Sequence, residues 1–102
     1  MIVRIVKMTF KPEHLEHFIN EVFEHSKKHI RNFDGCTHLE LHQDAAHKNI
    51  LYTYSIWENE GCLNVYRNSE LFEKTWAKTK VLFADRPQAF SLEKVTEVSD
   101  KE

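Results

Sequence analysis

The sequence of 102 residues contains only two glycines, two prolines and two cysteines. Two glycines cannot build a P-loop or a dinucleotide-binding turn, because both need a glycine-rich loop, so nucleotide cofactors are not expected. Cys36 and Cys62 fit no CxxC or zinc-ligand spacing and follow no secretory leader. We therefore expect free thiols in a reducing compartment, and hence a cytoplasmic protein.

Long hydrophobic runs and a strong excess of one charge are also missing. No apolar stretch approaches the ~20 residues that a membrane-spanning helix needs, so no membrane association is expected. The formal net charge of -2 leaves no basic surface for nucleic acid. Hydrophobic residues form 41% of the chain, which suits a single globular domain. We expect that domain over residues 1–98, followed by a charged tail over 99–102.

Hydrophobic periodicity divides the first part of the chain into a strand, a helix and a hairpin. Met1–Phe10 is apolar and β-branched, which predicts a central strand. Pro12 suits the first position of a long amphipathic helix, whose apolar residues recur up to Phe33. Beyond Asp34-Gly35, the runs Cys36–Gln43 and Ile50–Trp57 indicate two antiparallel strands joined by a polar turn.

The second part of the chain continues with helices and a last strand. One helix is expected over Asn59–Arg67, a second is capped by Ser69, and a fourth strand is expected over Gln88–Val98. The order β-α-β-β-α-β predicts a ferredoxin-like α+β subunit, a four-stranded antiparallel sheet with helices on one face. Because Ile50–Trp57 has apolar or aromatic side chains on both faces, we expect a second copy of the chain to cover the free face as a homodimer.

Several of these residues also resemble a known family. They are the run Phe33-Asp34-Gly35-Cys36 before the second strand, Trp57-Glu58 at the end of the third, and Leu63, Tyr66, Ser69 and Phe72 in the following helices. With this pattern the chain resembles the antibiotic biosynthesis monooxygenase family, whose members are dimeric α+β barrels of ferredoxin-like subunits. The resemblance implies cofactor-free oxidation of a small planar aromatic compound, a quinol or an anthrone, by O2.

The chain departs from the family pattern at four positions. Tyr66 stands where many members have histidine, and Ser55 stands where they often have an acidic residue. Thr53 replaces the asparagine of the quinone-forming branch. Trp76 matches the iron-ligating histidine of the haem-degrading branch, and tryptophan cannot ligate iron. The resemblance therefore implies neither haem nor another cofactor.

Four residues are candidates for contact with an aromatic substrate. Trp57 could stack on a planar ring and donate its indole N–H to a substrate oxygen, or it could be a core residue. Tyr66 could offer a phenol donor to the same cavity, or its hydroxyl could face bulk water. Thr53 and Trp76 are further candidate contacts, and β-branched packing and the inner face of the last helix are their alternatives.

A base is sought among the seven histidines. Helical spacing places His29 in the apolar stripe of the first helix, where it could act as a base or be a buried histidine bonded to a carbonyl. His25 and His29 have a spacing that can hold a metal, but no third ligand is evident and no metal is expected. On one strand face, His38, Glu40 and His42 could form a polar cluster that responds to pH if that face met the dimer partner, or they could simply be a solvated strand edge.

Three functions remain open on these residues. The first is the cofactor-free monooxygenase, with His29, Trp57 and Tyr66 as its catalytic candidates. The second is a non-catalytic ligand-binding or stress-associated dimer, and the third is an isomerase or lyase acting on a small carbonyl compound. A closed cleft filled by Trp57 and Trp76 would favour the second function, whereas an open cavity with converging polar groups would favour the first.

Overall fold

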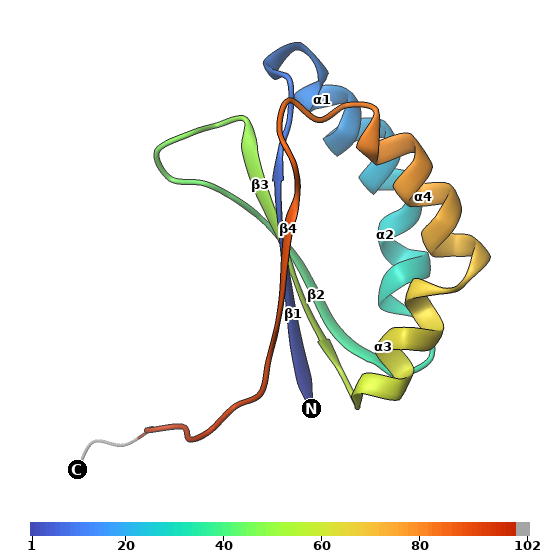
Figure 1. Ribbon diagram of the computed structural model, residues 1–102, viewed down its shortest axis with the longest axis vertical. Helices are drawn as coiled ribbons and strands as arrows, with labels where there is room; N and C mark the ends of the chain where they lie inside the picture. The colour runs from blue at the N-terminus through green and yellow to red at the C-terminus, as the bar shows by residue number, and fades with distance from the viewer. Residues whose placement is uncertain (100–102) are drawn as a thin grey trace.

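The structure, a computed structural model, describes residues 1–99 and forms one sheet with helices on one of its faces (Figure 1). The strands are β1 (Ile2–Thr9), β2 (Cys36–Gln43), β3 (Ile50–Trp57) and β4 (Gln88–Leu92). They pair antiparallel in the order β2-β3-β1-β4. This confirms the predicted ferredoxin-like α+β subunit. Residues 100–102 of the expected tail lie outside the described residues.

A single helical segment follows β1, but it is not a regular α-helix. It begins with the 3-10 turn η1 (Pro12–His14) and passes through α1 (Leu15–His17) and the π-helix η2 (Phe18–Phe23). It ends with α2 (Glu24–Arg31). The start at Pro12 is confirmed, whereas the π-helical turn was not predicted from the sequence.

The π-helical turn affects which side chains face the sheet. The buried residues recur every four positions, at Phe18, Val22, Ser26 and Ile30. In a regular α-helix each step of four would rotate by about 40°, because one turn holds about 3.6 residues, and the wider π-helical turn reduces this drift. His29 lies outside this buried row and is exposed to solvent. The expectation that His29 lies in the apolar stripe is therefore wrong.

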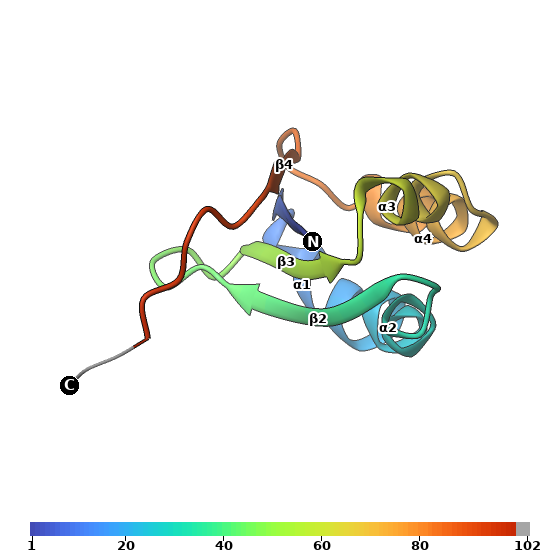
Figure 2. The ribbon, with the colours of Figure 1, turned by 90° about the horizontal axis from the view of Figure 1, so that it is seen from below.

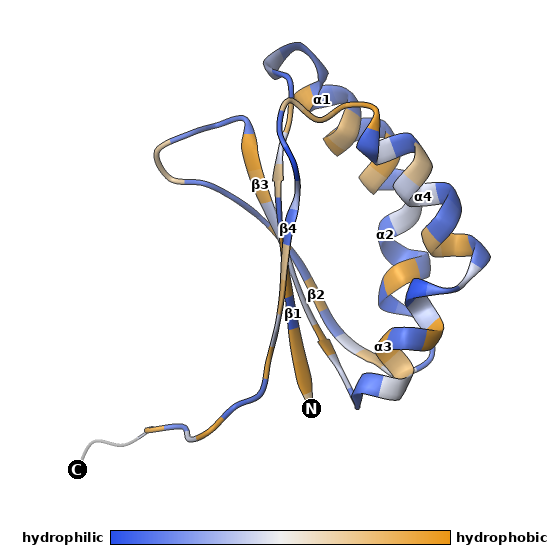
Figure 3. Cartoon of the chain, viewed as in Figure 1, coloured by the Kyte–Doolittle hydropathy of each residue, from blue (hydrophilic) through white to orange (hydrophobic). Residues whose placement is uncertain are grey.

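Two short helices complete the layer. Helix α3 (Glu60–Arg67) is capped by Asn59, and α4 (Glu70–Lys80) is capped by Ser69, whose hydroxyl accepts the Phe72 N–H at 3.1 Å. The predicted Ser69 cap is confirmed. Figure 2 shows α2 on the β2 side of the helix layer, and α3 and α4 on the β4 side. In Figure 3 hydrophobic and hydrophilic residues alternate along each helix, as expected for amphipathic helices lying on a sheet.

The last strand is shorter than predicted. It ends at Leu92, whereas the sequence suggested pairing as far as Val98. Leu92 pairs with Val3, and β1 begins at Ile2, so the chain beyond Leu92 has almost no strand left to pair with. Residues 93–99 leave the sheet without regular structure (Figure 1).

Two apolar clusters form the core between sheet and helices. One contains Met8, Phe10, Phe18, Val22, Leu51 and Leu82, and the other contains Ile2, Cys36, Trp57 and Leu63. Both cysteines are free thiols. Within residues 1–99, no helix is long and apolar enough to cross a membrane.

Candidate functional site

The two apolar clusters are separated by polar side chains in the middle of the sheet. Alternation along β1 sends Arg4 to the helix-covered face between the buried residues Ile2 and Met8. On β3 the same face carries Thr53 and Ser55 between the buried residues Leu51 and Trp57. Arg4 lies opposite Ser55 in the β1–β3 register and opposite Ser91 in the β1–β4 register. The centre of the covered face is therefore polar, although its ends are apolar.

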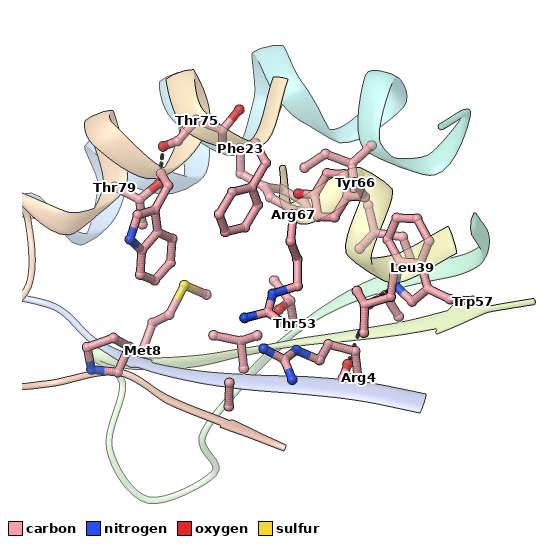
Figure 4. A pocket seen from close by; sticks show the side chains of 18 of the residues that line it. Arg4, Met8, Phe23, Leu39, Thr53, Trp57, Tyr66, Arg67, Thr75 and Thr79 are labelled. Atoms are coloured by element: carbon pink, nitrogen blue, oxygen red, sulfur yellow. Dashed lines mark hydrogen bonds between the residues drawn. The ribbon is translucent and has the colours of Figure 1, made fainter. Parts of the chain in front are cut away.

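A cavity of about 520 Å³ lies over this polar centre. Its floor includes Arg4 and Thr53 from the sheet, and its roof includes Phe23, Arg67 and Thr75 from the helices. Figure 4 shows Trp57, Tyr66 and Leu39 at one end, Met8 and Thr79 at the other, and Arg4 and Arg67 between them. The exposed lining residues Asn64, Arg67, Asn68 and Ala89 connect the cavity to solvent. Its volume lies within the usual range for small-molecule sites.

Aromatic rings form a continuous wall along the cavity. The rings of Trp57 and Tyr66 are stacked with centroids 4.8 Å apart, and Phe33 packs edge-on against Tyr66 at 5.4 Å. Tyr66 then contacts Phe72, which stacks on Trp76 at 5.9 Å. Such a wall suits a flat, apolar ligand, because aromatic rings prefer offset-stacked and edge-to-face contacts.

The indole N–H of Trp57 already has a partner within the subunit. Trp57 is 1% exposed and donates its Nε1–H to Ser55 Oγ at 3.0 Å. The indole therefore forms the wall of the cavity, while its donor is directed to Ser55. The expectation that this N–H is free to bind a substrate oxygen is not met in this structure. Ser55, noted only as a departure from the family, positions Trp57.

The hydroxyl groups in the cavity are donors rather than bases. Burial, and secondarily the nearby Cys36 thiol, raise the pKa of the Tyr66 phenol above its usual value. Tyr66 therefore stays protonated at neutral pH and can only donate or share its proton. Thr53 offers a second hydroxyl from the floor of the cavity.

Two guanidinium groups share the cavity. Arg4 donates to Ser91 Oγ at 2.8 Å, and neither Arg4 nor Arg67 forms a salt bridge with any residue in 1–99. Partial burial, and then the like charge of Arg67, lower the pKa of Arg4. The two guanidinium groups line the same cavity, so the positive charge of Arg67 acts on Arg4. Figure 4 shows both side chains reaching into the space between sheet and helices.

Within residues 1–99, no side chain that titrates near neutral pH lines the cavity. Among the described residues that line it, none is Asp, Glu or His. His29 is exposed on α2 and does not line the cavity, so the structure does not bring it to the other candidates. Residues 1–99 contain no group of three or more His, Cys, Asp or Glu side chains arranged to hold a metal.

Trp57, Tyr66, Thr53 and Trp76 all line this one cavity. Their action on a substrate stays a prediction. Sequence reasoning missed Arg4 and Arg67. The available signal was Arg4 itself, a charge in a strand whose neighbours on the same face are apolar.

Comparison with known proteins gives the family. The sequence model for antibiotic biosynthesis monooxygenase matches residues 1–78, and the chain belongs to this family. A comparison with curated proteins finds no significant match.

Solved structures share the fold over nearly the whole chain. A crystal structure of an antibiotic biosynthesis monooxygenase superposes with a TM-score of 0.87 at 14% identity, covering 94% of this chain and 100% of that one. A conserved protein from Methanosarcina mazei Go1 gives 0.85 at 21% identity, covering 92% and 93%. A protein from Mycobacterium tuberculosis gives 0.84 at 17% identity, covering 96% and 98%. At these identities the likeness concerns the fold alone.

Proposed function

We propose that this protein oxidises a small planar aromatic compound of the quinol or anthrone type with O2, without a cofactor. The observation that carries the proposal is the cavity of about 520 Å³, lined by aromatic rings and converging polar groups. Trp57 and Trp76 form its walls rather than filling it. Family membership is consistent with this chemistry.

The reaction needs no external reductant, because the substrate supplies all the electrons. An anthrone loses a proton to give an enolate, and the enolate transfers one electron to O2 to give a radical and superoxide. These combine as a hydroperoxide at the methylene carbon, which loses water to leave a carbonyl group. One oxygen atom enters the product and the other leaves as water, so the four electrons taken by O2 come from the methylene carbon.

The protein's part is to orient the ring and stabilise the anion. Trp57 and Tyr66, stacked on each other, and the Phe72–Trp76 pair form the wall for the ring. Tyr66 and Thr53 can donate hydrogen bonds to a substrate oxygen.

Oxygen consumption tests the proposal directly. Purified protein freed of metal and flavin should consume O2 with anthrone or a hydroquinone and form the quinone. Trp57→Phe should lower kcat/KM by up to about fivefold, since the aromatic contact is worth about 1 kcal/mol. Tyr54→Phe, on the uncovered face of the sheet, serves as the matched control and should leave the rate unchanged. No oxygen uptake across the panel would overturn the proposal.

One observation favours a second function, the binding of an aromatic ligand without turnover. The described lining of the cavity has no Asp, Glu or His to act as a base. This also weighs against an isomerase or lyase, which needs one. Saturable binding of anthrone with no O2 uptake and no product would support the ligand-binding function.

We also propose that a second copy of the chain covers the free face of the sheet. Cross-strand pairing aligns Ile56, Val3 and Leu92 in one row of that face, and Tyr54, Ile5 and Phe90 in the next. Phe90 is 49% exposed and Leu92 is 48% exposed, so residues 1–99 leave this apolar surface uncovered. A two-fold dimer would bury both rows.

Sedimentation equilibrium tests the dimer. Wild-type protein should have twice the chain mass of 12.2 kDa. Phe90→Glu should yield monomers, because each interface would then bury two unpaired charges. Val65→Glu, at an exposed valine of α3, is the control and should remain dimeric. A monomeric wild-type protein would contradict the proposal.

A further inference from the structure

Arg4 and Arg67 are an unusual pair, because two like charges face one cavity with no acidic partner. Neither forms a salt bridge within residues 1–99, and no carboxylate lines the cavity in this part of the chain. Arg4 is half-buried in the floor, where its guanidinium donates one hydrogen bond within residues 1–99, to Ser91. Partly buried charges are normally paired, so we expect the two guanidinium groups to be completed by an anion that binds in the cavity.

The same cavity lacks a group that could deprotonate a substrate. His29 is exposed on α2, the Tyr66 phenol is held protonated, and no other described lining residue can accept a proton near neutral pH. Oxidation by O2 nevertheless requires an electron-rich anion. The cavity that holds the two positive charges of Arg4 and Arg67 is therefore also the cavity whose described lining has no base.

We infer that Arg4 and Arg67 bind the substrate as its oxyanion, a phenolate or an enolate, and so take the place of a protein base. This inference rests on the proposed function and specifies its substrate class: planar aromatics with an acidic hydroxyl or an enolisable carbonyl. The proton leaves to water through the solvent-exposed side of the cavity, where Asn64, Arg67 and Asn68 lie.

The geometry suits an oxygen atom at the centre and a ring at one end. Figure 4 places Arg4 and Arg67 between the Trp57–Tyr66 end and the Met8–Thr79 end. A ring against Trp57 and Tyr66 would thus direct its oxygen substituent toward both guanidinium groups. Opposite charge within about 4–6 Å favours the ionised form of an acid and lowers its pKa by about one to three pH units.

Titration of a bound chromophore tests this inference without any turnover. The probe is 2-hydroxyanthraquinone, a product-like ring whose absorption changes when its hydroxyl ionises. Bound to wild-type protein, its pKa should fall about one to three pH units below the value in water. The neutral analogue 2-methoxyanthraquinone has nearly the same shape and cannot ionise, so it reports contact with the aromatic wall alone.

Variants assign the effect to the arginine pair. Arg4→Met and Arg67→Met should each raise the pKa of the bound probe toward its value in water and weaken phenolate binding by about tenfold, since each pH unit equals about tenfold. Both should bind 2-methoxyanthraquinone as wild type does. Arg67→Lys should restore part of the phenolate affinity. Arg86→Met, which removes an exposed arginine that does not line the cavity, is the charge-matched control and should change neither ligand.

Three outcomes would overturn the inference: an unshifted pKa of the bound probe, phenolate affinity retained in both Met variants, or a probe that does not bind. Its failure is separable from that of the proposed function. Oxygen uptake with an unshifted probe would refute the oxyanion site alone. A lowered probe pKa with no oxygen uptake would refute the oxidation and leave an oxyanion-binding site.

Discussion

The ends and the middle of the helix-covered sheet face differ in kind. At the ends, Phe10 and Trp57 are fully buried in separate apolar clusters. In the middle, Arg4 of β1 and Thr53 and Ser55 of β3 line a cavity. The alternation of the strands is unbroken throughout, so the fold does not require the polar centre. The difference separates core residues such as Phe10 from residues that shape a binding site, and Trp57, which is buried and also lines the cavity, belongs to both groups.

The largest expected effect is on stability at the two ends. Trp57→Ala and Phe10→Ala should each lower the free energy of unfolding by about 3–5 kcal/mol, because each leaves a large void among buried side chains. Thr53→Val in the middle should change it by less than about 1 kcal/mol, since the site borders a cavity already. Urea denaturation followed by circular dichroism measures all three. Equal losses of unfolding free energy in Thr53→Val and Phe10→Ala would contradict the distinction between the ends and the middle of the sheet face.

A smaller loss is expected where β2 approaches α3. Gly35 has a φ of 89°, and a β-carbon there would overlap the side chain of Cys62. Gly35→Ala should cost about 2–4 kcal/mol, the sum of backbone strain and overpacking. Gly61→Ala is the control, because Gly61 lies within α3 at an ordinary φ, with the Asn59 side chain its nearest neighbour. Combining Gly35→Ala with Cys62→Gly should recover only the part of the lost unfolding free energy that comes from the overlap with Cys62.

Ser55 connects the end of the sheet to its middle. Ser55→Ala should cost about 1–3 kcal/mol, because the buried N–H of Trp57 would lose its acceptor. Ser91→Ala is the matched control on the other side of Arg4, and its cost should be below about 0.5 kcal/mol because Ser91 is exposed. Thermal denaturation gives both values. A red shift of Trp57 fluorescence on ligand-free Ser55→Ala would show that the indole has moved.

The sequence predicted the fold well because the fold depends on patterns that a single chain carries. Alternation defined β2 and β3 with their observed bounds, and Ser69 was identified as a cap from its position. His29 was misplaced because the apolar stripe was taken as too wide: within α2, His29 lies about 60° round the helix from Ser26 and about 100° from Ile30, where it is exposed. The end of β4 was predicted too late because it is set by the partner strand: β1 begins at Ile2, so little of it remains to pair beyond Leu92.

The candidate site was predicted only in part, for a related reason. Its aromatic members are large and apolar, so the sequence singled out Trp57 and Trp76. Arg67 lies on the exposed side of α3 by spacing alone, and its approach to Arg4 depends on how α3 lies over the sheet. A charge pair formed between distant segments has no local signature.

The smallest expected effect concerns the uncovered face and depends on pH. Hydrogen bonds from His42 and His38, each 2.6 Å from a Glu40 carboxylate oxygen, lower the pKa of Glu40. These contacts bring the three side chains together within one subunit, whereas their response to pH stays a prediction. A carboxylate with a lowered folded pKa contributes stability that is present above its unfolded pKa, about 4.3, and lost as pH falls through the folded value.

Glu40→Gln removes the carboxylate that takes up a proton, and the Tm of this variant should therefore depend less on pH below about 4. The Tm of the wild-type protein should fall more steeply than that of Glu40→Gln as the pH drops below about 4, because only the wild type loses a carboxylate there. Glu58→Gln, at an exposed carboxylate after β3, controls for the loss of one negative charge. Parallel profiles for wild type and Glu40→Gln would show that the cluster contributes nothing to folding. If the second copy covers this face, the difference should grow with protein concentration, because burial at the interface would strengthen the ion pairs.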